Sequence, residues 1–237
     1  AAAGEHARVL VTPETGTTVG VDGWGLGPRD AAIAALSELS RRHDLFAVVG
    51  VFHNPTNDNR AWFVDPLAGL VGEYRKAHLI PWLEDYTAGD GALVVADVAG
   101  AKLGAVICQD DNFTDVARAY GREGVQVLAV PTNDWAAIRE YHLENSIYRA
   151  LENGYAMVRG TSNGVSAIVS PRGEVVSRHD HVRHGDGVTI VSTVRVGDGV
   201  PTVYARLGDL PIAALCAGLL LVALARRRRP APDAGAP

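Results

Sequence analysis

Cys108 is the residue to which the sequence most directly assigns chemistry. The apolar residues 104–107 stop at this thiol, and the polar segment Gln109–Asn112 follows it. A short apolar run that ends at polar residues is typical of a buried strand whose last side chain opens into a loop. A sulfur nucleophile needs such a support, which is rigid behind and accessible in front. The alternative interpretation is a buried cysteine that only fills space in the core.

Charged residues also stand at the ends of other apolar runs. Glu14 follows the run Val9–Val11, and Lys76 ends a predicted strand, with Glu84 eight residues further on. A thiol with a pKa of about 8.5 is mostly protonated at neutral pH, so it needs a base or a cation beside it. No histidine is close to Cys108 in the sequence, so a Cys–His pair would have to form in space. Taken singly, Glu14 is also compatible with a helix-capping carboxylate, Lys76 with a solvated charge and Glu84 with a loop acid.

In this order, the segments around Glu14, Lys76 and Cys108 resemble the Glu-Lys-Cys signature of the carbon–nitrogen hydrolase (nitrilase) superfamily. The resemblance extends from about residue 9 to the apolar segment near the C-terminus, so it covers nearly the whole chain. The sequence Tyr-Ala-Arg-Leu-Gly-Asp at 204–209, followed by that segment, resembles one branch in particular, the apolipoprotein N-acyltransferases. The superfamily implies an α/β fold, namely a four-layer α-β-β-α sandwich.

The resemblance implies a role for each of these side chains. Glu14 would take the proton from Cys108, and would later return it to the leaving group or activate the incoming nucleophile. The ammonium group of Lys76 would stabilise the negative oxygen of the tetrahedral intermediate. Glu84 would position Lys76 or the base. We therefore expect these side chains to converge around one carbonyl carbon.

Gln109 and Asp110, which follow the nucleophile, depart from the acyltransferase branch, where an aromatic residue and a glutamate are expected. This departure bears on the identity of the substrate rather than on the nucleophile. The backbone N–H of Gln109 would be the second oxyanion donor, and Asp110 occupies an acidic position of the family. Trp24, Trp135 and His142 are candidate substrate contacts, although a core or surface histidine is the alternative interpretation of His142.

Three histidines, His179, His181 and His184, lie close together in the sequence, which suggests a metal site as one interpretation. Such clusters are more often solvated loops, which is the interpretation that we prefer, so we predict no metal ion and no cofactor. The net charge of −5 provides no basic face, and we exclude nucleic acid as a partner. The chain has two cysteines, one of them Cys216 in an apolar segment, and this excludes a disulfide framework.

Strands and helices alternate along the chain, which predicts sheets that are covered by helices. Helices are predicted at 28–43, 113–123 and 141–153. Residues 53–59 form a dense cluster of turn formers and are predicted as a turn. The predicted strands are 9–11, 46–52, 61–64, 70–75, 93–98, 102–107, 125–131, 157–160, 165–170 and 174–177.

The apolar segment Leu210–Ala225 has sixteen residues without a charge, and four arginines follow it. We predict a transmembrane helix over 208–229, with the arginines on the cytoplasmic side and the catalytic domain, 1–207, on the extracytoplasmic side of the cell membrane. A buried or amphipathic helix with a basic tail is the alternative. Residues 230–237 have the composition of a disordered tail. Because the superfamily has a strand and a helix before the glutamate, we expect that residues 1–207 lack them and belong to a longer protein.

Three functions are compatible with these observations. The first is a membrane-attached thiol acyltransferase, in which Cys108 takes an acyl chain from a phospholipid and passes it to the N-terminal amine of a lipoprotein. The second is an amidohydrolase of the same superfamily, in which water resolves the thioester of a small amide or nitrile. The third is an inactive, membrane-tethered scaffold. The apolar segment and residues 204–209 favour the first.

Overall fold

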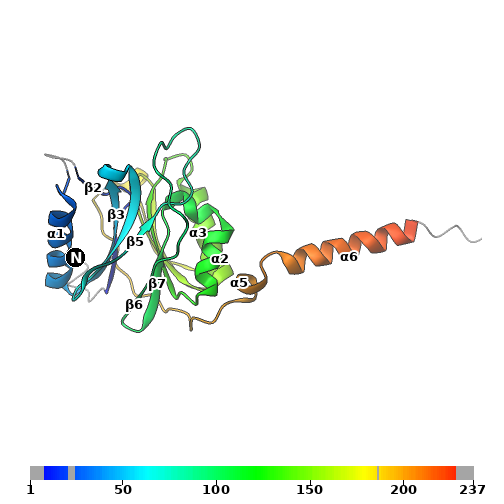
Figure 1. Cartoon of the computed structure of the whole chain (residues 1–237). Helices are drawn as coiled ribbons and strands as arrows, with labels where there is room; N and C mark the ends of the chain where they lie inside the picture. The colour runs from blue at the N-terminus through cyan, green and yellow to red at the C-terminus, as the bar shows by residue number, and fades with distance from the viewer. Residues whose placement is uncertain (1–7, 21–24, 186, 228–237) are drawn as a thin grey trace, which may run out of the picture.

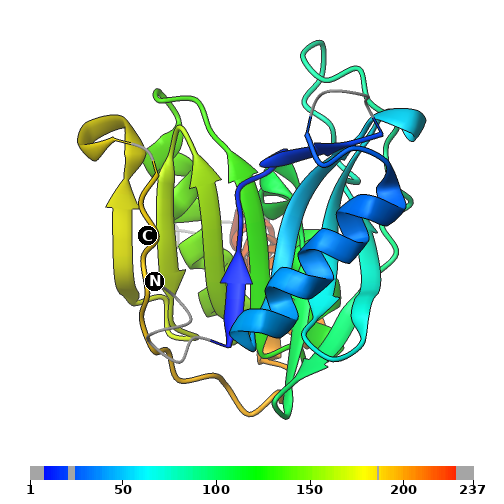
Figure 2. The ribbon, with the colours of Figure 1, turned by 90° about the vertical axis from the view of Figure 1, so that its left-hand side faces the viewer.

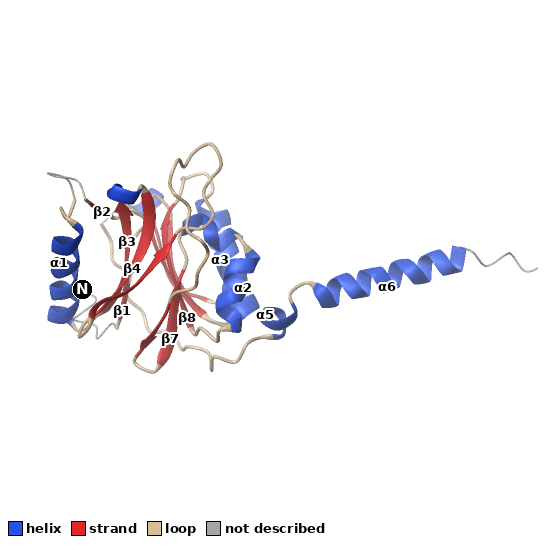
Figure 3. Cartoon of the chain, in the orientation of Figure 1, coloured by secondary structure: helices blue, strands red, loops and turns tan. Residues whose placement is uncertain are grey.

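The computed structural model describes residues 8–20, 25–185 and 187–227. They form two β-sheets that pack face to face, and helices cover the outer face of each sheet (Figure 1). Figure 3 shows the same layers by element type, with the strands between the outer helices. The predicted α/β fold with four layers is therefore confirmed. The helices of the outer layers are α1 (Arg29–His43), α2 (Thr114–Arg122) and α3 (Arg139–Asn153).

The first sheet lies against α1 and has mixed strand directions. Its central strand, β3, pairs in parallel with β1 and β2 and antiparallel with β4, which in turn pairs with β5. Seven of the eight residues of β3 are buried, as expected for a strand that is covered on both faces. The strands are β1 (Val9–Val11), β2 (Thr17–Val19), β3 (Phe46–His53), β4 (Asp58–Asp65) and β5 (Gly69–Arg75).

The second sheet lies against α2 and α3 and has the order β11-β10-β9-β8-β7-β6. Its three middle strands β7, β8 and β9 are parallel to one another, and the remaining pairs are antiparallel. Parallel neighbours end at the same edge of a sheet, so the residues that follow these three strands lie near one another. The strands are β6 (Val95–Val98), β7 (Ala101–Ala105), β8 (Val127–Asn133), β9 (Ala156–Ser162), β10 (Val165–Val169) and β11 (Val175–Asp180).

Several predicted boundaries are wrong, and polar residues account for most of them. Residues 53–59 are not a single turn: a short helix η2 (Asn54–Thr56) is followed at once by β4, which begins at Asp58. Asp58 and Asn59 look like turn residues in the sequence, yet both are buried inside the sheet. The histidine-rich segment is not a loop either, because β11 extends to Asp180 and the short helix α4 (His181–His184) follows.

The backbones of the two sheets come into contact where β1 ends. β1, the blue strand that points upward near the centre of Figure 2, contacts β8 and β9 of the second sheet as well as its own neighbour β3. Gly50 on β3 makes room for this close approach, because a Cβ atom there would lie 2.1 Å from the carbonyl oxygen of Pro13. Gly160 does the same on β9, where a Cβ atom would lie 2.7 Å from the carbonyl oxygen of Val11. The two glycines therefore fix the position of the backbone that carries Glu14.

Gly50→Ala should lower both stability and activity. The three atoms nearest to the methyl group would be backbone atoms of Pro13 and Glu14, which cannot rotate away. We expect a loss of about 1–3 kcal/mol in the free energy of unfolding from overpacking. We also expect an activity loss of about 10²-fold, because Glu14 must shift. Urea denaturation and initial rates measure the two effects. Gly218→Ala is the control, since nothing lies within 4 Å of a Cβ atom built there.

The C-terminal part leaves the sandwich through a short helix and then a long one. Helix α5 (Val203–Leu207) is held against α2, because Arg118 and Arg122 donate hydrogen bonds to the carbonyl oxygen of Ala205. Helix α6 (Leu210–Arg227) then projects away from the four layers with its apolar side chains exposed (Figure 1).

The predicted transmembrane helix over 208–229 is not confirmed. Within the described ranges of the chain, no helix reaches the length and apolar character that crossing a membrane requires. The predicted tail, 230–237, lies outside the described residues.

Candidate active site

Cys108 lies where β7 has ended and the short helix η3 (Cys108–Asn112) begins. Ala105 and Ile107 belong to the core between the two sheets, and Val106 belongs to the core under α2 and α3, so the thiol is mounted on a rigid support. Its backbone has a φ of 45°, which is in the left-handed region and is uncommon for a residue other than glycine. The side chain is buried, with 4 % of its surface exposed, and Sγ donates a hydrogen bond to the carbonyl oxygen of Asn133 at 3.7 Å.

Lys76 joins the two predicted glutamates. Its Nζ lies 2.8 Å from Oε1 of Glu14 and 2.6 Å from Oε1 of Glu84, and the lysine side chain is fully buried. Glu14 also accepts a hydrogen bond of 2.6 Å from the side chain of Asn59 on β4. Glu84 is held in turn by the backbone N–H of Ile80 at 2.9 Å. The structure therefore brings Glu14 next to Lys76 and Glu84, although Glu14 lies 62 residues from the lysine in the sequence.

The charges of Glu14 and Lys76 both act on the thiol of Cys108. Burial is the largest influence and raises the pKa of Cys108; the Glu14 carboxylate raises it further, and Lys76 partly offsets the rise. For Lys76, burial opposes the charge, but the coupling to Glu14, together with Cys108 and the hydrogen bond to Glu84, outweighs it and raises the pKa. The thiol is therefore protonated at rest, beside a lysine that is charged.

Asp110 connects the loop that carries Lys76 to the loop that carries Cys108. Its buried carboxylate accepts hydrogen bonds from the backbone N–H of His78 at 2.7 Å and of Ile107 at 3.2 Å, and from the hydroxyl of Tyr74 at 2.9 Å. Ile107 precedes the nucleophile, and His78 follows the lysine by two residues. Asp110 therefore fixes the position of Lys76 relative to Cys108.

The pair of His78 and Asp110 should make stability depend on pH. The hydrogen bond to Asp110 raises the pKa of His78, and burial offsets this only in part. A raised pKa in the folded state stabilises the protein below about pH 6.5, and this contribution is lost as the pH rises through the folded-state value. His78→Gln should therefore cost more free energy of unfolding at pH 5.5 than at pH 8.5, by about 0.5 kcal/mol because the ring is partly solvated. Equal losses in urea denaturation at both pH values would contradict this.

The remaining predicted site residues differ in location and in exposure. The side chain of Gln109 accepts a hydrogen bond of 2.9 Å from Asn112 at the surface of η3. Trp135 is half-exposed, with 51 % of its surface accessible, in the loop after β8. His142 lies on α3 and is buried, with 2 % exposed, so it faces the interior and not the solvent. Trp24 lies outside the described residues.

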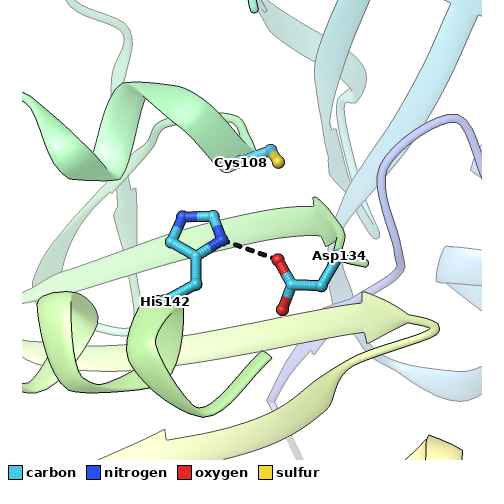
Figure 4. A group of neighbouring side chains, drawn as sticks. All are labelled: Cys108, Asp134 and His142. Atoms are coloured by element: carbon cyan, nitrogen blue, oxygen red, sulfur yellow. Dashed lines mark hydrogen bonds and ion pairs between the residues drawn. The ribbon is translucent and has the colours of Figure 1, made fainter. Parts of the chain in front are cut away.

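A buried polar network behind Cys108 was not predicted from the sequence. Figure 4 shows Cys108 next to His142 and Asp134, whose Nδ1 and Oδ1 atoms lie 2.6 Å apart. The other oxygen of Asp134 is 2.7 Å from Nη2 of Arg159 on β9. Nη1 of the same arginine lies 3.6 Å from Oδ2 of Asp111, and all these carboxylate and guanidinium groups are fully buried.

Two signals in the sequence could have revealed part of this site. Arg159 is a charged residue in the middle of an apolar strand, and a buried charge requires a partner of opposite charge. Asn59, which binds Glu14, was included in a predicted turn, although it belongs to strand β4. The partners themselves, such as Asp111 and Asp134, become apparent only when β7, β8 and β9 are assembled.

Donor atoms of Cys108, Asp134 and His142 all lie within 4.8 Å of one another, a spacing that would suit a metal ion. Each of the three side chains already has a protein partner: Asp134 binds His142 and Arg159, and the thiol binds Asn133. We therefore treat the group as a hydrogen-bonded network and assign no metal to it.

The arrangement fits nucleophilic acyl transfer. A buried thiol needs a base, which the Glu14 carboxylate can provide, and a cation for the oxyanion, which Lys76 can provide. In the low dielectric of the interior, these charges act more strongly than they would in water.

Comparisons with known proteins give the family. The family model described as carbon-nitrogen hydrolase matches residues 1–199. The chain therefore belongs to the carbon–nitrogen hydrolase family, as its resemblance predicted.

The curated relatives are acyltransferases. The apolipoprotein N-acyltransferase of Ralstonia nicotianae is 30 % identical over 253 residues, which cover 95 % of this chain and 47 % of the relative. That of Methylococcus capsulatus is 28 % identical over 247 residues, which cover 94 % of this chain and 47 % of the relative. The chain thus spans about half the length of these relatives.

Solved structures show the same fold. An amidase from Nesterenkonia sp. has a TM-score of 0.63 at 20 % identity and covers 91 % of this chain and 85 % of its own. Nit3 of Saccharomyces cerevisiae, a member of branch 10 of the nitrilase superfamily, has a TM-score of 0.61 at 19 % identity and covers 73 % of each chain.

Proposed function

We propose that this chain is the catalytic part of a membrane-attached N-acyltransferase. Glu14 takes the proton of Cys108, and the thiolate attacks the acyl ester of a phospholipid. The lysophospholipid leaves and an acyl thioester remains on the sulfur. The N-terminal amine of a lipoprotein then attacks the thioester carbonyl, an amide forms, and the sulfur is released. Lys76 stabilises the oxyanion of both tetrahedral intermediates, together with the backbone N–H of Gln109.

The observation that carries this proposal is the bridge from Lys76 to Glu14 and Glu84 beside the buried thiol. It supplies a base and a cation at one place, whichever acyl group is bound. The choice of transfer over hydrolysis is supported by the relatives, which are named apolipoprotein N-acyltransferase along nearly the whole chain.

The membrane attachment is supported by α6. Its large side chains, such as Leu215, Leu219 and Val222, are apolar and more than half exposed, and four arginines end the segment. Burying such a surface in lipid is favourable, and basic segments are retained on the cytoplasmic side. We therefore propose that α6 attaches the catalytic part to the cell membrane and that this part lies on the extracytoplasmic side.

Amide hydrolysis is the second candidate, and Gln109 is the observation that favours it. This polar side chain, hydrogen-bonded to Asn112, stands next to the nucleophile where the acyltransferase branch is expected to have an aromatic residue. A polar rim suits a small amide better than a lipid chain. In this reaction water, and not an amine, would resolve the thioester.

One assay distinguishes the candidates. The chain is incubated in phospholipid vesicles that carry a radiolabelled acyl chain, with a lipopeptide that has an S-diacylglyceryl cysteine at its N-terminus. Label on the peptide amine supports acyl transfer. Ammonia released from small amides such as propionamide, without label on the peptide, supports hydrolysis and overturns the proposal. If a folded chain forms neither of the two products, the result supports an inactive scaffold and also overturns the proposal.

A further inference from the structure

Asn59 lies on β4, on the face of the first sheet that is turned toward the second sheet. Ala61 and Phe63 of the same strand belong to the core between the sheets, whereas Trp62 belongs to the core under α1. Because side chains alternate along a strand, Asn59 points to the same side as Ala61 and Phe63. A polar side chain that is buried in this apolar region loses its hydration, so it needs a partner in the protein.

The partner of Asn59 is Glu14, the proposed base. The side-chain amide donates a hydrogen bond of 2.6 Å to Oε1 of Glu14, and both side chains are buried. The backbone carbonyl oxygen of Asn59 accepts a hydrogen bond of 2.9 Å from the N–H of Lys76, so the asparagine and the lysine are neighbours on adjacent segments of the chain. The two side chains therefore reach Glu14 from the same sheet.

Both donors bind the same oxygen of Glu14. Nζ of Lys76 lies 2.8 Å from Oε1, which Asn59 also contacts, and within the described ranges of the chain no donor binds Oε2. The backbone N–H of Glu14 donates to the carbonyl oxygen of Thr132 at 3.2 Å, which ties the base to the second sheet as well. One oxygen of the carboxylate is therefore fixed by two donors, and the other is left to receive a proton.

Lys76 has a second task, and Asn59 does not share it. The lysine ammonium group has three N–H donors, and Glu14 and Glu84 engage two of them. The third is the donor for the oxyanion, and the long stem of a lysine lets the group move as the intermediate forms. Asn59 has a short side chain on a strand, so its contact with Glu14 does not depend on that movement.

We propose that Asn59 is a positioning residue that selects which oxygen of Glu14 acts as the base. The amide occupies Oε1, so the S–H bond of Cys108 breaks and an O–H bond forms at Oε2. The proton stays on Oε2 until it passes to the leaving group, and the thiolate forms the thioester. Asn59 acts through Glu14 and not on the substrate. The inference rests on the proposed roles of Glu14 and Cys108, and it applies equally to transfer and to hydrolysis.

Acylation of Cys108 by a small activated ester tests this role without any lipid. In a Cys216→Ala background, Cys108 is the sole thiol of the chain, and p-nitrophenyl butyrate releases nitrophenolate as the thioester forms. Asn59→Leu keeps the approximate shape of the side chain and removes the donor. It should lower the acylation rate constant by about 10²-fold at pH 7.5, and change the half-saturating ester concentration by less than about two-fold. Asn54→Leu, an exposed change five residues earlier, is the matched control and should keep the parent values.

Asn59→Asp separates the positioning of the base from a loss of packing. The new carboxyl group has the shape of the amide and lies against the carboxylate of Glu14, so the two groups share one proton at low pH. Lys76 holds the negative charge on Glu14, and the new group therefore keeps the proton and donates it to Oε1 as the amide does. Asp58 and Arg60 point to the opposite face of the sheet, where they pair with each other at 2.6 Å.

The acylation rate of Asn59→Asp, relative to the parent at the same pH, should therefore change with pH. We expect a rate within about ten-fold of the parent at pH 6.0. At pH 8.5 the relative rate should fall to about that of Asn59→Leu, because the shared proton is lost and the two carboxylates repel each other. A purely structural role gives the same relative rate at both pH values and overturns the proposal. A folded Asn59→Leu protein that is acylated at the parent rate overturns it too.

A measurement on the parent protein covers the case in which the variants do not fold. NMR of the assigned side-chain amide of Asn59 should show one proton that is protected from exchange with solvent, both before and after acylation of Cys108. Free exchange of both amide protons would overturn the role of Asn59. A parent protein that is not acylated at Cys108 overturns the proposed function and, with it, this role. An acylated parent with unaffected Asn59 variants overturns the role of Asn59 alone.

Discussion

Cys108→Ala should abolish formation of the acyl-enzyme and lower the rate of acyl transfer by at least about 10⁴-fold. The sulfur is the atom that forms the covalent bond, and no other described side chain of the site offers a nucleophile in its place. The stability should change little, by about 1 kcal/mol, because only one buried atom is removed. The assay is the appearance of a hydroxylamine-sensitive label on the protein, followed by label on the lipopeptide.

Cys216 provides the matched control for this prediction. It is exposed on α6, far along the chain from the site, and Cys216→Ala should keep the parent rate. More than about 1 % of the parent rate in a folded Cys108→Ala protein would show that the sulfur is not the nucleophile, because loss of a covalent catalyst costs far more than that.

Lys76→Met should destabilise the fold and inactivate the enzyme together. The substitution leaves the carboxylates of Glu14 and Glu84 buried without their cation, which costs about 3–5 kcal/mol. Folding raises the pKa of Lys76, so its stabilising contribution is present below about pH 10 and is lost as the pH rises further. Urea denaturation at pH 7.5 measures the loss, and the acyl-transfer rate should fall with it.

Two further variants make this result specific. Lys102→Met alters the other lysine of the chain, which is exposed and should cost less than about 1 kcal/mol. Adding Glu84→Gln to Lys76→Met removes one of the two carboxylates left without a cation and should recover part of the lost stability. If the Lys76→Met and Lys102→Met proteins have equal free energies of unfolding, the ion pairs of Lys76 with Glu14 and Glu84 do not stabilise the fold.

Hydrophobic patterning was sufficient for most of the architecture. The strand predicted at 46–52 and the helix predicted at 28–43 match β3 and α1 within one residue at each end. Their residues repeat at the spacing of a buried strand and of a helix, so local information suffices. β2 was not predicted, because the polar sequence Thr17–Val19 becomes a strand only through its pairing with β3.

The residues of the site also fall into two groups, those that the sequence predicts and those that become apparent only in the folded structure. Glu14, Lys76 and Cys108 could be proposed because each stands at the end of an apolar run and because the three occur in a known order. For His142 the sequence left a substrate contact and a core or surface histidine open, and the bond of its ring to Asp134 could not be predicted. Its partners come from strands that meet only in the folded sheet, and sequence spacing contains no record of that.

The burial of the sulfur has a consequence beyond the reaction itself. Peroxides and soft metal ions attack a cysteine through its anion, and the environment of Cys108 disfavours that form. A nucleophile that is protonated between turnovers should survive an oxidising milieu that would convert a more acidic thiol to a sulfenic acid. Burial of Cys108 should thus protect the sulfur of the enzyme from oxidation between turnovers.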